Sequence, residues 1–431
     1  MLLYALQWLV VVLPLVVISA RLMAAFLGMD AGEGNLLFQK MLLVVGAVTV
    51  IQCRLGHRYP LVDGPSAALL LSVAALAQEG YAAVLGGMLT GAAALVLLGI
   101  TGLLGKVTGL FADRVVGVVL ILIALTFLPH LVPMVTGTSP SHPGGDPFIM
   151  LVAIIVTIAI IVISSYARGF LGNLSILAGI VLGYMIMVFA GRVDFAHAAS
   201  APLVSLPWPI LGPTPRFTTA GTVSFLLANV AVLINGLGSY TASAQVVGGE
   251  DVDGRVRRGV STTGAAGVLA ALTGTLGTVS YSQGPGIVLV TRVGSRYPVL
   301  VSGLMLCALA FFTRFTAYLI TVPEAVVGAA LLVTLSTMVG LGVSIIGRQG
   351  GKARARENMI VGLPLLLGGS AALLNDPFLS QLPLPVRGIV GNGLIVGIVA
   401  VLLLEHVIFK ASRIQDPRSK IQDPRSKIQC G

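Results

Sequence analysis

Long apolar runs separated by short polar breaks make up most of the chain. A membrane-spanning helix needs about 20 mostly apolar residues, so there is room for about fourteen such segments. The predicted segments are 2–20, 36–53, 60–77, 82–101, 114–134, 147–165, 172–190, 219–238, 259–279, 280–296, 298–313, 319–340, 358–374 and 386–409. The pattern therefore predicts an all-α polytopic membrane protein.

The third and tenth segments differ from the others because turn-forming residues stand where a helix should start. One contains Asp63-Gly64-Pro65-Ser66 and the other Gln283-Gly284-Pro285-Gly286. Glycine and proline both disfavour helix, so short extended stretches are expected in these two segments. Irregular backbone at membrane depth is tolerated inside protein or beside a watery cavity. Both breaks should therefore lie in the interior.

The two breaks also suggest an internal repeat, since they lie 220 residues apart, close to half the chain. Seven segments per half is an odd number, so the halves would run through the membrane with opposite topology. Paired, interrupted segments in inverted halves are typical of a transporter binding site near the midplane. The alternative is two unrelated Pro-Gly kinks.

Composition excludes a water-soluble protein. Hydrophobic residues make up 56% of the 431 residues and charged residues 10%, against about 25% charged in soluble domains. A soluble enzyme, a nucleic-acid binder and a receptor with a large ectodomain are ruled out. The three cysteines have no metal-like spacing, and no catalytic constellation or phosphate-binding loop is present. We expect neither enzymatic activity nor a cofactor or metal.

The distribution of basic residues predicts the orientation. With the N-terminus inside, 20 of the 26 Lys and Arg residues fall in cytoplasmic loops and the tail. This bias follows the positive-inside rule and places both termini in the cytoplasm. The apolar N-terminus is interpreted as a first span and not a signal peptide. We predict an integral protein of the plasma (bacterial inner) membrane, with a disordered cytoplasmic tail over 411–431 that repeats Ile-Gln-Asp-Pro-Arg-Ser-Lys.

The tenth segment reads Gln283-Gly-Pro-Gly286-Ile-Val-Leu-Val-Thr291-Arg292. It resembles the signature of the nucleobase–ascorbate transporter family (nucleobase:cation symporter 2, the xanthine/uracil permease type), with Gly284 in place of the family's Asn. The resemblance covers about residues 1–409, as a divergent member.

Three other family positions are altered. The first-span Gln-His pair is Gln7-Trp8, the third-span Gly-x-Ser-Phe is Gly64-Pro65-Ser66-Ala67, and the eighth-span acid of Glu-x-x-Gly is Asn235.

The resemblance implies a secondary active transporter for nucleobases that works by alternating access, couples to a proton or another cation, and forms homodimers. It divides the chain into a core domain (1–110 and 219–315) that holds the substrate and a gate domain (111–218 and 316–410). Membrane lipid and a small nucleobase are the expected partners.

The chemistry of a nucleobase identifies the candidate substrate contacts. A flat ring edged with donors and acceptors needs an apolar slot with a few polar groups. The planar amide of Gln283 can make two hydrogen bonds to such an edge, and half-helices starting near the two breaks offer unpaired N–H groups. The alternative is that Gln283 only satisfies broken backbone. Neighbouring candidates at the two breaks are Tyr281, Ser282, Gly284 and Ser66.

Three substitutions shape the expected specificity. Asn235 can bond a base but cannot exchange a proton, and it could instead join helices. Trp8 could stack on a ring or be an interfacial aromatic. Ala67 replaces a ring-stacking Phe, so the pocket should be roomier and should favour purines such as xanthine, hypoxanthine or urate over uracil.

Proton coupling needs a group that changes charge, and neither Asn235 nor Trp8 can. Asp63 is the candidate, as the repeat counterpart of Gln283 and an acid inside a span. The alternative is that Asp63 caps the following half-helix. Rival functions are a sulfate/bicarbonate-type anion transporter of similar fold, an uncoupled facilitator, and a non-transporting membrane sensor.

Overall fold

The computed structural model describes residues 1–105, 113–139, 142–167, 172, 174–248, 251–347, 355–374, 376–379, 381–383, 386–387 and 390–409. These residues are mostly helical. Among them, seven helices are long and apolar enough to cross a membrane, or eight if one bent pair counts as a single span. The prediction of an all-α polytopic protein is confirmed at this level. The predicted tail over 411–431 lies outside the described residues.

The elements follow one another as a series of helices interrupted by two short strands. In chain order they are α1 (Leu2–Phe26), α2 (Ala31–Arg54), β1 (Asp63–Pro65), α3 (Ala67–Leu76), η1 (Ala77–Glu79), α4 (Tyr81–Thr101), α6 (Asp113–Thr136), α7 (Pro147–Tyr166), α9 (Ser175–Phe189), α10 (Ala196–Ser200), α11 (Thr219–Val247), α12 (Val252–Thr273), β2 (Thr278–Ser280), α13 (Gly284–Thr291), α14 (Tyr297–Leu309), α15 (Thr313–Ile320), α16 (Glu324–Gly347), α17 (Ala355–Ala372), α18 (Asp376–Leu379), α20 (Gly393–Leu403) and η2 (Leu404–Ile408).

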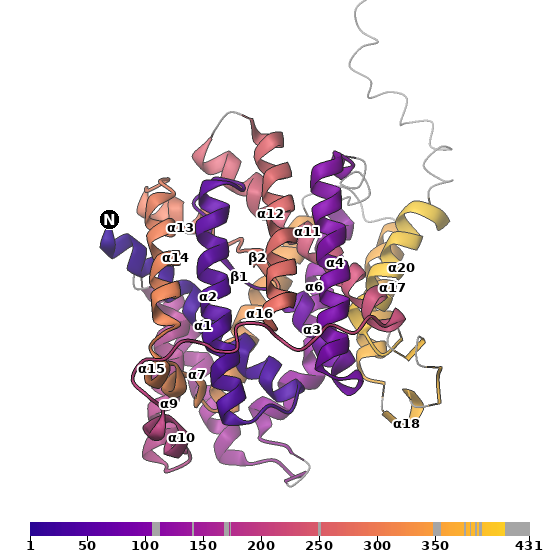
Figure 1. Ribbon diagram of the computed structural model, residues 1–431. Coiled ribbons are helices and arrows are strands. Elements are labelled where there is room, and N and C mark those ends of the chain that lie inside the picture. The colour runs from indigo at the N-terminus through magenta and orange to yellow at the C-terminus, as the bar shows by residue number, and fades with distance from the viewer. Residues whose placement is uncertain are drawn as a thin grey trace, which may run out of the picture.

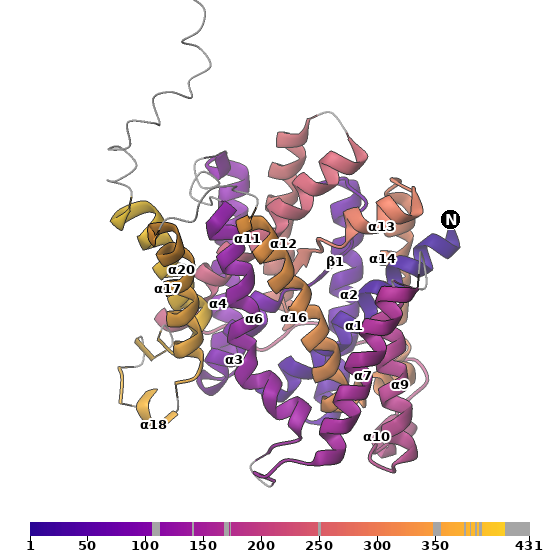
Figure 2. The ribbon, with the colours of Figure 1, turned by 180° about the vertical axis from the view of Figure 1, so that it is seen from behind.

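The helices pack in two groups. In the first group, α4 packs on α11 and α12, α2 packs on α14, and α1 contacts α2, α3 and α14. In the second group, α16 packs on α6, α7 and α9, and α17 packs on α6 and α20. Figure 1 shows α2, α4, α12 and α14 of the first group nearest the viewer, and Figure 2 shows α6, α7 and α16 of the second group from the opposite side. Each group combines helices from both halves of the sequence.

The strands β1 and β2 pair at the centre of the molecule, between the helices that surround them (Figure 1). The pairing is antiparallel, with Asp63 opposite Ser280, Gly64 opposite Val279 and Pro65 opposite Thr278. All six residues are buried. The extended backbone satisfies its polar groups partly in this pair and partly through side chains, since the Asp63 N–H donates to Thr49 Oγ1 and the Ser280 carbonyl accepts from Ser239 Oγ. Such pairing inside protein is the condition for non-helical chain in a membrane protein. We call this pair the central ribbon.

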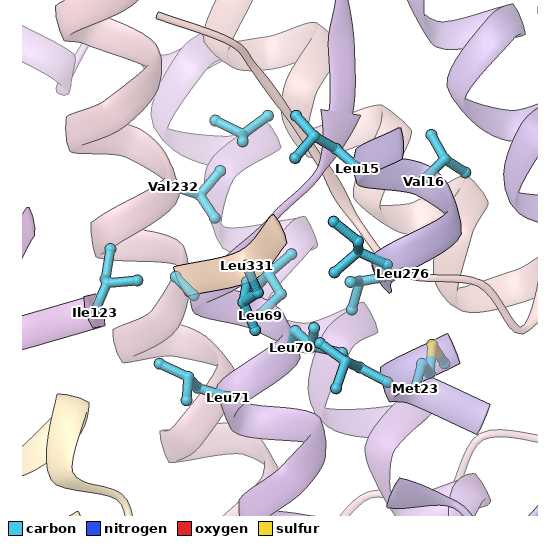
Figure 3. Packing of buried hydrophobic residues seen from close by; sticks show 14 of the residues in the cluster. Leu15, Val16, Met23, Leu69, Leu70, Leu71, Ile123, Val232, Leu276 and Leu331 are labelled. Atoms are coloured by element: carbon cyan, nitrogen blue, oxygen red, sulfur yellow. The ribbon is translucent and has the colours of Figure 1, made fainter. Parts of the chain in front are cut away.

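Buried aliphatic side chains fill the space beside the central ribbon. Figure 3 shows Leu15 and Val16 of α1, Leu69 to Leu71 of α3, Ile123 of α6, Val232 of α11 and Leu331 of α16 gathered there. Leu69 and Val16 are fully or almost fully buried. Leu331 and Ile123 bring the second helix group against the first, so this cluster lies at the boundary between the groups.

Several predicted boundaries are wrong, because hydropathy marks lipid contact and not the ends of a helix. The eighth segment was expected over 219–238, but α11 continues to Val247. The ninth was expected to begin at 259, but α12 begins at Val252, where the Asp251 side chain caps the helix. The eleventh, expected over 298–313, ends with a bend of 95° between α14 and α15.

Candidate functional site

A cavity of about 130 Å³ lies at the boundary between the two helix groups, beside the central ribbon. Its polar lining comes from Asn235 of α11 and from Tyr281, Ser282 and Gln283, which follow β2. The rest is apolar or hydroxyl-bearing: Leu15, Ile18, Ser19, Leu22, Pro65, Ala67, Leu70, Leu120, Phe127, Val279, Leu331, Thr334, Leu335, Thr337, Met338 and Leu341. No Lys, Arg, Asp or Glu is among these lining residues. The cavity is therefore an uncharged, mostly apolar slot with a few polar side chains on its wall.

Two short helices begin at the edge of this cavity. Ser66 precedes α3 and Gln283 precedes α13, and neither side chain caps its helix. The first N–H groups of a helix have no partner inside the helix, and the helix dipole makes that end partly positive. Both half-helices therefore present positive ends toward the centre of the molecule.

The side chains of Gln283 and Asn235 are free to meet a ligand. Gln283 is exposed and Asn235 half-buried, and neither side-chain amide makes a hydrogen bond to another described residue. Gln283 also lines a second cavity of about 400 Å³, between Val10 and Val11 of α1 and Ser175 and Ile176 of α9. Gln283 thus stands where the two cavities meet. For Asn235, the lack of a bond to another helix disfavours a purely structural role.

Tyr281 forms part of the cavity wall by lying over Gly64. Its hydroxyl donates a hydrogen bond to the backbone oxygen of Pro65 at 3.2 Å. A Cβ atom at position 64 would come within 2.3 Å of the Tyr281 ring. Only glycine leaves room for this close approach, so the first break and the residue after the second strand depend on each other.

Three predicted contacts do not line the cavity. Ser66 is buried, and its N–H donates to Gly277 O at 3.0 Å. Trp8 is 4% exposed and packs in the hydrophobic core. Gly284 is buried against Leu61, where a Cβ atom would lie 2.3 Å from Leu61 Cδ2. The space that a larger residue would take at position 284 is filled by Leu61.

Asp63 lies on the other side of the central ribbon from Tyr281 and does not line the cavity. Its carboxylate accepts a hydrogen bond from Ser280 Oγ at 2.8 Å, and its N–H donates to Thr49 Oγ1 at 3.2 Å. Its cross-strand partner is Ser280, and the pairing of the strands does not test whether Asp63 is the repeat counterpart of Gln283. Ser66, not Asp63, holds the position before α3, so Asp63 does not cap that helix. Asp63 is buried inside the protein, with 0% of its surface exposed.

The sequence analysis did not identify two sets of residues around the ribbon and the cavity. His57 is 0% exposed and faces Asp63, although it belongs to a polar stretch that reads as a loop between two spans. Its position six residues before Asp63 was the available signal. The second helix group supplies Leu120 and Phe127 from α6 and Met338 from α16 to the cavity. Nothing in their apolar pattern separates them from lipid-facing residues.

Comparison with known proteins gives a consistent result. The model of the Permease family matches residues 1–376. The chain is 25% identical to the uric acid transporter UacT of Escherichia coli (strain K12) over 88% of this chain and 80% of that protein. It is 24% identical to the xanthine permease of Bacillus subtilis (strain 168) over 94% and 92%. Among solved structures, the transmembrane domain of the cyanobacterium bicarbonate transporter BicA has a TM-score of 0.59 at 15% identity, covering 94% of this chain and 96% of that one, a likeness of fold alone.

Proposed function

The chain belongs to this permease family, and from that premise we propose that it transports purine nucleobases such as xanthine, hypoxanthine or urate across the membrane. The observation that carries the proposal is the unpaired amide of Gln283 at the start of α13, on the wall of an uncharged central cavity. The relatives named as uric acid transporter and xanthine permease support the substrate class.

The cavity suits a flat, neutral or weakly anionic ring. Gln283 offers an acceptor and two donors in one plane, which match an N–H/C=O edge in two hydrogen bonds. Asn235 can bond a second edge, and the Tyr281 ring forms an aromatic wall for stacking. Ala67 leaves space where a phenylalanine would intrude. These features favour a bicyclic purine over uracil.

Transport would proceed by alternating access, with the first helix group as core (1–110 and 219–315) and the second as gate (111–218 and 316–410). The packing of α16 on α6, α7 and α9, apart from the α2–α14 and α4–α12 pairs, supports this division. The central cavity lies between the two groups, so a shift of one against the other would open it to each side in turn.

The same proposal includes fourteen segments in a seven-plus-seven inverted repeat, both termini in the cytoplasm, cation coupling and a homodimer. The two half-helices α3 and α13, each preceded by a strand of the central ribbon, support the repeat. Two features favour a nucleobase over the rival sulfate/bicarbonate-type function. The described cavity lining has no cationic side chain to pair with a small inorganic anion, and such an anion has no ring edge for the Gln283 amide to pair with.

Substrate binding tests the proposal directly. Purified protein should be stabilised against heat by xanthine, hypoxanthine or urate, because a ligand that binds the folded state raises stability by mass action. Gln283→Ala should abolish this stabilisation and counterflow exchange in proteoliposomes while leaving the size-exclusion profile unchanged. Gln381→Ala, at a glutamine outside the cavity, is the matched control. Unchanged purine affinity in Gln283→Ala, or stabilisation by sulfate and bicarbonate but by no nucleobase, would contradict it.

A further inference from the structure

A connected set of buried polar side chains lies behind the central ribbon, away from the substrate cavity. We call it the buried polar cluster; its members are Gln52, His57, Asp63, Tyr240, Thr263 and Ser280. Ser280 Oγ donates to Asp63 Oδ1 at 2.8 Å and lies 3.3 Å from the Tyr240 hydroxyl, which is 3.1 Å from Thr263 Oγ1. Gln52 Nε2 donates to Thr263 Oγ1 at 3.0 Å. No member of this cluster lines the substrate cavity.

The hydrogen bonds of His57 fix where its proton lies. The backbone N–H of Tyr59 donates to His57 Nδ1 at 2.9 Å, so Nδ1 is an acceptor and carries no proton. The neutral ring then carries its proton on Nε2. His57 Nε2 points toward Asp63 Oδ2 at 3.9 Å, and neither atom has a hydrogen-bond partner in the described chain.

The separation of these two atoms depends on whether Asp63 carries a proton. A charged carboxylate would accept from Nε2–H, and such a bond closes to about 2.9 Å. A protonated carboxyl with its hydrogen on Oδ2 would face Nε2–H as a second donor, and two donors do not bond. At 3.9 Å the two atoms do not form this bond. Loss of the proton would draw Asp63 and His57 together by about 1 Å.

The surroundings favour a site that alternates between these two forms. Both side chains are 0% exposed, and no Lys or Arg in the described chain lies within 4.0 Å of the Asp63 carboxylate. A buried charge without a partner is strongly disfavoured. The other titratable groups beside the pair are neutral acids: the Cys53 thiol of α2 and the hydroxyls of Tyr59 and Tyr240. The Tyr281 hydroxyl lies across the ribbon and is bonded to the Pro65 carbonyl.

Two arginine side chains lie near the cluster, further from the Asp63 carboxylate than His57. The Arg255 guanidinium of α12 lies over the Tyr59 ring, 5.1 Å from its centroid. Arg296, which precedes α14, exerts its charge on Cys53. Neither one neutralises Asp63 directly. Ser280 Oγ already donates to Oδ1, and His57 Nε2 is the titratable group of the described chain that faces the unpartnered Oδ2.

The buried polar cluster also reaches the substrate cavity by a short route. Ser239 Oγ lies 2.9 Å from both the Ser280 and the Asn235 backbone oxygens, so its single proton can be donated to either. Ser280 is followed directly by Tyr281, Ser282 and Gln283 on the cavity wall. A movement of Asp63 toward His57 would therefore pull on the strand that carries the substrate contacts.

We propose that Asp63 binds the co-transported proton and that His57 is its positioning residue, which closes on the carboxylate once the proton has left. The proton arrives from water on one side, forms the O–H bond at Asp63 Oδ2, and leaves to water on the other side after the core has moved. The inference rests on the proposed nucleobase transport and names the site of its cation.

The decisive experiment compares uptake in proteoliposomes with and without an imposed pH gradient, using radiolabelled xanthine. Wild-type protein should accumulate xanthine several-fold when the gradient drives protons with it. Asp63→Asn should lose this accumulation entirely while keeping counterflow exchange and purine-induced thermal stabilisation. Glu405→Gln, which removes another buried carboxylate, in η2 of the second helix group, should still accumulate.

The role of His57 is tested by the pH profile of gradient-driven uptake, which a purely structural role of His57 would leave unchanged. His57→Phe removes the Nε2–H donor, so the carboxylate loses its partner and the proton should be released at higher pH. The pH profile of gradient-driven uptake should shift toward alkaline values, and His57→Gln, which keeps an N–H donor, should restore it in part. An unchanged profile in His57→Phe would exclude the positioning role.

The outcomes separate the two proposals. If wild-type protein shows no counterflow of any nucleobase, the proposed function fails. If wild type exchanges xanthine but ignores the pH gradient, or if Asp63→Asn still accumulates it, nucleobase transport stands and the proton site is wrong. Should Asp63→Asn fail to fold, the His57→Phe profile and proton uptake by wild type on xanthine binding, followed with a pH indicator, decide the question.

Discussion

Replacing Gly64 by alanine should displace the Tyr281 ring from the wall of the substrate cavity. The new Cβ atom would lie 2.3 Å from Cζ and from the hydroxyl oxygen of Tyr281 and 2.5 Å from Cε2, whereas non-bonded carbons sit about 3.5–4.0 Å apart. The ring must move by about 1 Å or more. Gly64 is not among the described glycines with positive φ, so the backbone itself accepts alanine.

The expected cost follows from this overlap. Forcing extra volume into a packed interior costs about 1–3 kcal/mol, and moving the ring also weakens the Tyr281 hydroxyl bond to Pro65. Gly64→Ala should therefore lower the thermal unfolding midpoint and weaken purine binding about five- to 150-fold if the whole cost appears in the dissociation constant.

A double-mutant cycle isolates the contact. In a Tyr281→Ala background there is no ring to displace, so adding Gly64→Ala should change stability and affinity little, giving a coupling energy of about 1–3 kcal/mol. Gly340→Ala, at a helical glycine with nothing within 4 Å of its added Cβ atom, controls for the substitution itself. An equal cost of Gly64→Ala in both backgrounds would refute the reasoning.

Three further predictions follow from other contacts. Ala67→Phe should fill the cavity beside Pro65 and weaken xanthine binding at least tenfold relative to uracil, measured by competition; a wild-type preference for uracil would contradict this. Gly284→Asn should lower the unfolding midpoint because Leu61 Cδ2 occupies the space, and Leu61→Ala in the same chain should recover part of the loss; no recovery would show that Leu61 is not the obstacle. The hydrogen bond and charge of Arg192 and the Phe148 N–H hold the pKa of Asp146, in the loop before α7, below its usual 3.8. A lowered pKa stabilises the folded state above the unfolded value, and this contribution is lost as pH falls through the folded value. Amide protection factors at the start of α7, corrected for the intrinsic exchange rate at each pH, should therefore fall between pH 7 and pH 3 in wild type but not in Asp146→Asn.

The sequence was sufficient to predict several residues of the cavity wall because their signals are local. Gly-Pro pairs cannot continue a helix, so the breaks at Gly64 and Gly284 were predictable, and the amide chemistry of Gln283 and Asn235 follows from their side chains. Both residues line the central cavity in the structure.

What the sequence could not supply depends on register and packing. The two Gly-Pro motifs made Asp63 the repeat counterpart of Gln283, but they could not show that Asp63 pairs with Ser280 and that only Gln283 lines the cavity. Trp8 sits on a helix whose rotation sends its ring into the core and not the cavity. His57 looked like a loop residue because burial of a polar stretch by α11 and α12 leaves no mark in the hydropathy of that stretch.

The central ribbon can form only after both of its strands have been synthesised. Asp63 and Ser280 are 217 residues apart, and at about 5–20 residues per second the ribosome needs roughly 10 to 40 s to add that length. During this interval β1 has no partner strand, although unpaired peptide groups are strongly disfavoured in lipid. The first half of the chain therefore cannot reach its final fold when it enters the membrane. It must wait in the translocon, among lipid headgroups or against a chaperone until residues 278–280 arrive and complete the pair.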